Sequence, residues 1–331
     1  MEAPASTSSS ASAGHATSHA AVPWLAYGSL ALSTSLVGSY VGLSKLLLAV
    51  FPVFLLAWLR FGMAAVLMLP WLRRAPGEPP LDGRTRRLLF LESFIGNFLF
   101  SICLLFGLQR SSALVAGVIM AGIPAAVAAL SWLVLGERIA RRVLLGIACS
   151  VLGIALVAVA REPAGAASAG GGASLLGVAL LLAAVLCEAC YVVIGKQLTA
   201  QVSAKRISSL INLWGLALVT PLGLWQALSY DFSRPSVGDW GLLLFYAAAA
   251  SMITVWLWMS GLARVPAAQA GVFMVFLPVA TGLVGLVFLG ERLSLVQALA
   301  YGLALLGVLL ATLPTGRLHA PDRPPGHEAL R

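Results

Sequence analysis

The chain has 331 residues, of which 60% are hydrophobic and only 10% are charged. A water-soluble fold of this size would lack the polar residues needed to cover its surface, since soluble domains carry about 25% charged residues. The composition therefore indicates a protein that crosses a membrane many times. The net charge of +9 does not indicate nucleic-acid binding, because the basic residues fall in short gaps between apolar runs, where topology signals lie.

Residues 1–22 are rich in Ala and Ser and contain no Lys or Arg, so they predict a disordered tail rather than a secretory signal. About 20 apolar residues cross the hydrocarbon layer, and the backbone inside lipid must be helical. The rest of the chain thus predicts an all-α membrane protein with ten transmembrane helices. Their approximate ranges are Trp24–Leu46, Phe51–Leu72, Leu88–Leu108, Ala113–Leu135, Val143–Ala160, Ser174–Lys196, Ile207–Tyr230, Trp240–Leu262, Ala267–Leu289 and Leu295–Leu313.

The distribution of basic residues predicts the orientation. With the N-terminus inside, fifteen of the 21 Lys and Arg residues lie on the cytoplasmic side, five lie outside, and Arg60 lies within a span. Cytoplasmic loops carry the excess of positive charge in membrane proteins. We therefore expect a multi-pass protein of the plasma (inner) membrane with both termini in the cytoplasm.

The sequence contains an internal repeat. A shift of 154 residues aligns 14 identical positions among the 33 from Gly107 to Ile139, including Pro124 with Pro278 and Glu137 with Glu291. The domains expected are a five-helix repeat at 23–160, a Gly/Ala/Ser linker at 161–173, a second five-helix repeat at 174–314 and a C-terminal tail at 315–331. Because five is odd, the second repeat enters the membrane inverted, an arrangement that serves alternating access to a site at the midplane.

The residues of this repeat resemble a known family. Trp58–Phe61, the prolines in the middle of the fourth and ninth spans, and the Gly-Glu-Arg sequences that close those spans are similar to the drug/metabolite transporter superfamily, in its ten-helix EamA-type family. The resemblance implies transport of small metabolites, often export of amino acids or related solutes. It also implies a central cavity lined mainly by helices 1, 3, 4, 6, 8 and 9, with helices 5 and 10 at the periphery.

Charged residues within the spans are candidates for the substrate or proton site, because each costs about 2.5–3.5 kcal/mol at the bilayer centre. Glu188 could carry a proton or pair with a cationic substrate group, or could be a neutral carboxyl bonded to a neighbouring helix. Arg60 could hold a substrate carboxylate through its planar fork. It could instead be structural, by pairing with Glu188 or Glu92 or by donating to backbone carbonyls left free near a kink. Glu92 lies near the cytoplasmic end of the third span, where solvent could reach it.

Neutral side chains complete the candidate site. On the helices expected to line the cavity, these are Tyr40, Asn97, Tyr191, Trp256 and Trp258, each of which could instead face lipid or pack. Pro124 and Pro278 are candidate hinges, although a transmembrane proline can also bend a helix statically. Glu137 and Glu291 are interpreted as structural caps or gate latches that accept hydrogen bonds from the start of the next helix.

Other chemistry is not indicated. All four histidines lie in the tails, the four cysteines suggest packing rather than a metal site, and no HExxH, GxSxG or Walker motif occurs, so no cofactor is expected. A secondary transporter of a small molecule, with proton coupling as one option, is therefore predicted over an uncoupled facilitator or channel, or a membrane enzyme acting on lipid. Small faces on helices 5 and 10, at Gly146, Ser150, Gly153, Gly307 and Ala311, offer close packing, with a homodimer as one outcome.

Overall fold

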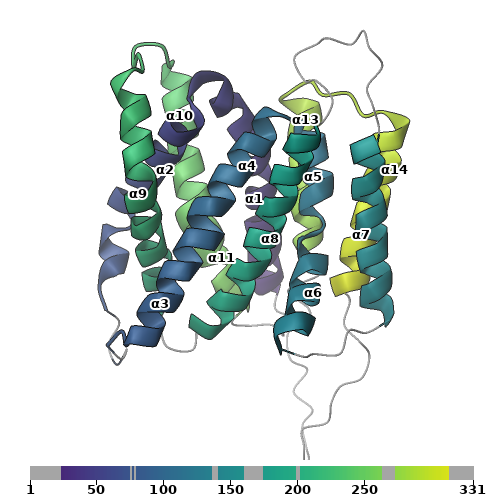
Figure 1. The fold of residues 1–331 in the computed structure, drawn as a ribbon, viewed down its shortest axis with the longest axis horizontal. Helices are drawn as coiled ribbons and strands as arrows, with labels where there is room; N and C mark the ends of the chain where they lie inside the picture. Colours follow the sequence, from purple (N-terminus) through teal and green to yellow (C-terminus); the bar gives the residue numbers. More distant parts are fainter. Residues whose placement is uncertain are drawn as a thin grey trace, which may run out of the picture.

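The computed structural model describes residues 24–74, 77, 80–135, 141–159, 174–198, 202–262 and 273–312. The predicted tails, 1–22 and 315–331, and the linker 161–173 lie outside these residues. The described elements are helices of the α, 3-10 and π types, arranged side by side (Figure 1). Their bounds are α1 Trp24–Val50, α2 Val53–Leu67, η1 Leu69–Leu72, α3 Gly83–Leu91, η2 Glu92–Leu99, α4 Phe100–Gln109, α5 Ala113–Met120, α6 Ile123–Leu135, α7 Arg141–Val159, α8 Leu175–Leu198, α9 Ala204–Leu228, α10 Val237–Ala248, η3 Ala249–Ile253, α11 Thr254–Leu262, η4 Phe273–Val275, α13 Phe276–Val287 and α14 Leu295–Thr312.

The prediction of an all-helical membrane protein with ten helices in two repeats is confirmed. Several spans are composite rather than single α-helices. The third span joins α3, η2 and α4, the fourth joins α5 and α6, and the eighth joins α10, η3 and α11. Six helices, counting these composites, are long and apolar enough to cross a membrane by length and composition within the described residues.

The two repeats interlock instead of forming separate halves. Helices α4 and α8 pack together, as do α1 and α11, so the third helix of each half lies on the first helix of the other. The helices approach closely at a glycine in both contacts. Between α4 and α8, a Cβ at Gly107 would lie 2.8 Å from Leu181, and between α1 and α11, a Cβ at Gly261 would lie 2.6 Å from Leu30. Helices α2 and α9 pair in the same way across the halves.

The fourth and ninth spans run in opposite directions. The residue Glu291, just after the end of α13, contacts the backbone at Ala113, where α5 begins. In Figure 1 the start of α5 and the end of α13 lie together at the upper edge. This antiparallel arrangement is the one that an inverted repeat requires.

Helices α7 and α14 form a tight pair at one side of the bundle (Figure 1). A Cβ at Gly146 would lie 2.8 Å from the Gly307 carbonyl oxygen, and one at Gly153 would lie 2.9 Å from the Ala300 carbonyl oxygen. The small faces of helices 5 and 10 are therefore used against each other within one chain. The close packing expected at these small faces thus occurs within one molecule, because small residues let two backbones approach closely, and a homodimer stays a prediction.

Candidate functional site

Arg60 of α2 lies in a buried polar cluster between helices of both repeats. Its side chain is only 4% exposed, and Nη2 donates a hydrogen bond of 2.8 Å to the hydroxyl of Ser101 on α4. The guanidinium carbon lies 4.0 Å from the ring centroid of Phe61 and 5.5 Å from that of Tyr246 on α10, contacts that stabilise a buried guanidinium. Nε has no hydrogen-bond partner among the residues that the structure describes. Arg60 therefore keeps N–H donors that can bind a carboxylate.

No acidic side chain neutralises Arg60 in the described part of the chain. Neither Glu188 nor Glu92 forms an ion pair with it, and the ion pair found there joins Lys45 to Glu291. The predicted alternative of an Arg60 pair with one of the two carboxylates is thus not observed. Instead of a carboxylate, the hydroxyl oxygen of Ser101 accepts a hydrogen bond from Arg60. The same hydroxyl donates its proton to the Asn97 carbonyl oxygen at 2.6 Å.

Two tyrosines extend the cluster from Arg60 toward Glu188. The ring centroids of Tyr40 on α1 and Tyr246 on α10 are 5.6 Å apart, and both side chains are buried. Tyr40 is close enough to interact electrostatically with both Arg60 and Glu188. Glu188 is half-buried on α8. Tyr40 thus lies near a cation and a carboxylate that form no ion pair with each other within the described residues.

Glu92 is the first residue of the π-helical segment η2. It is 1% exposed, which corrects the expectation that solvent reaches it at the cytoplasmic end of the span. Its Oε1 faces Gly195 on α8, where a Cβ would lie 2.8 Å away, and Oε2 has no hydrogen-bond partner within the described residues. Glu188 is close enough to interact with it electrostatically. A buried carboxyl group and a half-buried one therefore lie in the region between the third span and α8.

A second π-helical segment, η3, occupies the corresponding place in the other repeat. The shift of 154 residues aligns it with 95–99, inside η2. Asn97 Nδ2 donates to the Ile211 carbonyl oxygen of α9 at 3.1 Å, and the Ser251 hydroxyl donates to Asn212 Oδ1 at 3.2 Å. Helix α9 thus holds both segments, and the Asn97 side chain is bonded to it. Segments of π-helix are rare and are frequent at functional sites.

The remaining aromatic candidates lie in different environments. The Tyr191 ring packs on Gly96 of η2, where a Cβ would lie 2.6 Å from it. Trp258 packs against Leu30 in a small apolar cluster. Trp256 is 52% exposed at the outside of the bundle, so the expectation that it lines a central cavity is not met. A tryptophan in an apolar helix faces lipid as readily as protein, and the helical pattern does not distinguish the two.

Both prolines follow a helix break. α5 ends at Met120, and Pro124 is the second residue of α6, while Pro278 is the third residue of α13 after the 3-10 segment η4. A proline in the first turn removes no intrahelical hydrogen bond, because its N–H would be unpaired there. The hydroxyl of Tyr301 on α14 contacts Gly117 of α5 and donates to the Pro278 carbonyl oxygen at 3.4 Å. The two breaks are thus connected by one side chain, and their role as hinges stays a prediction.

Glu291 binds the start of α5 rather than the helix that follows it. Its Oε1 accepts the backbone N–H of Ala113 at 2.7 Å and its Oε2 accepts that of Leu114 at 2.8 Å. Lys45 at the end of α1 donates to the same Oε1 at 3.2 Å and to the Ser111 carbonyl oxygen at 2.9 Å. We call this group the Lys45–Glu291 latch, because it ties α1, α5 and the end of α13 together. Glu137, its counterpart in the first repeat, lies outside the described residues.

Three residues of these sites were not predicted from the sequence: Tyr246 and Ser101 beside Arg60, and Lys45 in the latch. A shift of 151 residues aligns Tyr40 with Tyr191 and Lys45 with Lys196, so the repeat carried a signal for Lys45. Tyr246 and Ser101 carried none, because a single hydroxyl in an apolar span is common in packed helices.

Cysteines and metals add nothing to the cluster. The described cysteines are free, and the thiols of Cys103 and Cys187 contact each other between α4 and α8. Among the described residues, no group of three or more His, Cys, Asp or Glu side chains could hold a metal ion.

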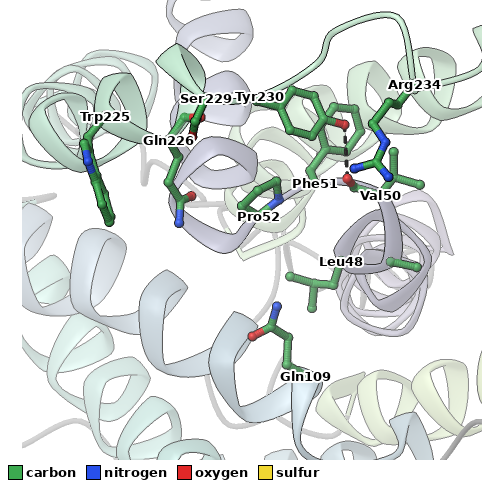
Figure 2. A pocket seen from close by; sticks show the side chains of 11 residues that line it. Leu48, Val50, Phe51, Pro52, Gln109, Trp225, Gln226, Ser229, Tyr230 and Arg234 are labelled. Atoms are coloured by element: carbon green, nitrogen blue, oxygen red, sulfur yellow. Dashed lines mark hydrogen bonds between the residues drawn. The ribbon is translucent and has the colours of Figure 1, made fainter.

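Two pockets lie at opposite ends of the α2–α9 pair, away from the cluster around Arg60. One, with a volume of about 530 Å³, lies where α1 joins α2 and near the ends of α4 and α9. Figure 2 shows Gln109, Gln226 and Arg234 around it, with the Tyr230 hydroxyl bonded to the Val50 carbonyl oxygen. The other pocket, of about 680 Å³, lies between η1, the start of α9 and α11.

Comparison with known proteins identifies the chain's relatives. The sequence profile of the EamA-like transporter family matches residues 24–159 and 175–313. The uncharacterized transporter YetK of Bacillus subtilis (strain 168) is 34% identical over 304 residues, which are 92% of this chain and 90% of YetK. The uncharacterized transporter YyaM of the same organism is 25% identical over 257 residues, 77% of this chain and 83% of YyaM. A protein of known crystal structure superposes with a TM-score of 0.57 at 19% identity, over 86% of this chain and 95% of that one, so it shares the fold.

Proposed function

Because the chain belongs to the EamA-like transporter family, we propose that this membrane transporter is a secondary carrier for a small metabolite that has both a carboxylate and an amino group, an amino acid or a related solute. The observation that carries this substrate class is the presence near buried Tyr40 of a cation, Arg60, and a carboxylate, Glu188, that form no ion pair with each other within the described residues. Arg60 binds the carboxylate through its free N–H groups, and Glu188 binds the amino group. In this proposal the buried rings of Tyr40 and Tyr246 contact the apolar part of the substrate.

The carrier works by alternating access, and the Lys45–Glu291 latch supports this part of the proposal. An opening at this end must separate α13 from α5, which breaks the bonds from Glu291 to Ala113 and Leu114. The sequence repeat aligns Lys196 and Glu137 with Lys45 and Glu291, so each half carries the same pair of residue types. We take the latch end as the outer one and both termini as cytoplasmic, since fifteen of the 21 Lys and Arg residues then lie inside. The direction of net transport in this scheme is export.

The carrier is proton-coupled through the carboxyl pair of Glu188 and Glu92. Two nearby carboxyl groups in a low dielectric do not both carry a charge easily, so one of them takes up and releases a proton. The Glu188→Gln variant should therefore exchange unlabelled for labelled substrate at a raised KM, because the amino group loses its charged partner, and this exchange should lose its stimulation by a pH gradient.

The experiment is counterflow into proteoliposomes with a panel of amino acids and related solutes, with and without an imposed pH gradient. Saturable counterflow is expected for one member of the panel. Flux that does not saturate would instead identify a channel, and conversion of a lipid or solute into a new compound would identify an enzyme. Unchanged coupling in Glu188→Gln, with Glu92→Gln tested beside it, would remove Glu188 from proton transfer.

A further inference from the structure

The pocket between η1, α9 and α11 lies outside the proposed substrate site. Neither Arg60 nor Glu188 lines it, and none of its lining residues belongs to α1, α4 or α8. Its lining residues are Pro70, Trp71, Arg73, Ser203, Ala204, Lys205, Val255, Trp256 and Ser260. The pocket has a volume of about 680 Å³, and because its lining residue Trp256 is half-exposed, we place its opening at the side of the bundle, toward lipid.

The charged groups of this pocket are all positive. Arg73 and Lys205 line it, both are exposed, and no described lining residue is acidic. The Lys205 ammonium nitrogen lies 5.6 Å from the Trp71 ring centroid, a cation–π contact that holds it beside the pocket. Both residues lie on the face that the basic residues predict to be cytoplasmic, where the anionic lipids of a membrane are concentrated.

The other lining groups divide into polar and apolar parts. The indoles of Trp71 and Trp256 are of the kind that lies at the headgroup level of a bilayer. Ser260 adds a hydroxyl group that can donate to phosphate, and Pro70 and Val255 add apolar surface. We infer that this pocket binds the headgroup of an anionic phospholipid, with the phosphate held by Arg73 and Lys205 and the start of an acyl chain against Trp256.

The pocket at the opposite end of the α2–α9 pair provides an internal comparison. It has a similar size but a different charge, because Arg234 is its one charged lining residue and Gln109 and Gln226 supply amides (Figure 2). The Arg73–Lys205 pocket therefore presents two cations to an anionic headgroup, where the pocket at the other end of α2 and α9 presents one.

The test uses the full-length protein in neutral detergent, which removes the surface potential of a bilayer. Short-chain phosphatidylglycerol and phosphatidylcholine with the same chains are titrated, and bound lipid is counted by native mass spectrometry. The test variant is Arg73→Gln/Lys205→Gln. The matched control is Arg86→Gln/Arg87→Gln, which removes the same charge from exposed residues of α3 on the same predicted face.

We expect phosphatidylglycerol to bind the native protein more tightly than phosphatidylcholine. The Arg73→Gln/Lys205→Gln variant should lose about thirtyfold in that affinity, since each cation near an anionic surface contributes about fivefold. The control should change by less than about twofold. Equal loss in both variants, no preference for phosphatidylglycerol in the native protein, or equal binding of glycerol phosphate without chains would each overturn the inference. If the double variant is not recovered, Lys205→Gln alone, with about a fivefold loss, tests the same point.

Discussion

The Lys45–Glu291 latch makes the sharpest prediction about the transport cycle. Replacing Glu291 by Gln keeps the size of the side chain but removes its charge and one of its two acceptor oxygens. The native carboxylate accepts backbone N–H groups at 2.7 and 2.8 Å, and its side chain is only 9% exposed. A hydrogen bond to a charged group contributes about 1.5–3 kcal/mol, against about 0.5–1.5 kcal/mol for a neutral one.

The substitution should therefore destabilise the closed state by about 2–4 kcal/mol. One backbone N–H keeps a hydrogen bond, but to a neutral oxygen, and the other N–H faces the NH2 group of the new amide and loses its acceptor. The population with this end open should rise at least about thirtyfold. Lys45→Met should have a smaller effect, because its bond to Oε1 is longer, at 3.2 Å, and its side chain is 19% exposed.

The assay is the rate at which a membrane-impermeant maleimide labels Cys introduced at Ala113, which is fully buried at the start of α5. Labelling should rise in the order native, Lys45→Met, Glu291→Gln. Asp231→Asn is the control, since this carboxylate is exposed and, among the described residues, accepts hydrogen bonds from Ser233 in its own turn. Labelling of Glu291→Gln at the native rate, in protein that still transports, would show that the latch does not hold this end closed.

Three further predictions follow from the described contacts. Arg60→Lys should raise the KM for a carboxylate substrate by about ten- to a hundredfold in proteoliposome counterflow, because the planar fork is lost; an unchanged KM would exclude Arg60 from substrate binding. Gly146→Ala should lower the free energy of unfolding by about 1–3 kcal/mol, because the new Cβ meets the Gly307 carbonyl oxygen at 2.8 Å. The loss is measured as a lower Tm. Gly302→Ala is the control, because its new Cβ meets nothing within 4 Å and should not lower Tm. Hydrogen bonds from Thr85 hold the pKa of the Asp82 carboxyl below its ordinary value of 3.8. The Asp82 carboxylate should therefore stabilise α3 above pH 4, and this stabilisation should be lost as the pH falls below that. The dependence of Tm on pH, measured between pH 3 and 6, should be weaker in Asp82→Asn than in the native protein.

Local and repeated patterns accounted for much of the fold. Long apolar runs must form helices in lipid, and the self-alignment of Gly107–Ile139 with the second half revealed two repeats. Pro124 and Pro278 predicted bends in the fourth and ninth spans, whereas the π-helical segments η2 and η3 were not predicted, because the contacts that accompany them, such as the bond of Asn97 to Ile211 on α9, join residues far apart in the chain. For the same reason the candidate site was predicted in part: intramembrane charge pointed to Arg60, Glu188 and Glu92, whereas the neighbours of those groups could not be inferred.

The sequence by itself determined that the chain is a helical membrane protein with two copies of a five-helix unit, because burial in lipid imposes apolar length and helical backbone on every span. Only the tertiary structure decided which surfaces meet. It paired α7 with α14, bound Glu291 to the start of α5, and left Trp256 at the periphery. An apolar helix face within a membrane can contact either another helix or lipid, so its sequence does not show which of the two it contacts. Close packing and hydrogen bonds between residues far apart in the chain decide this.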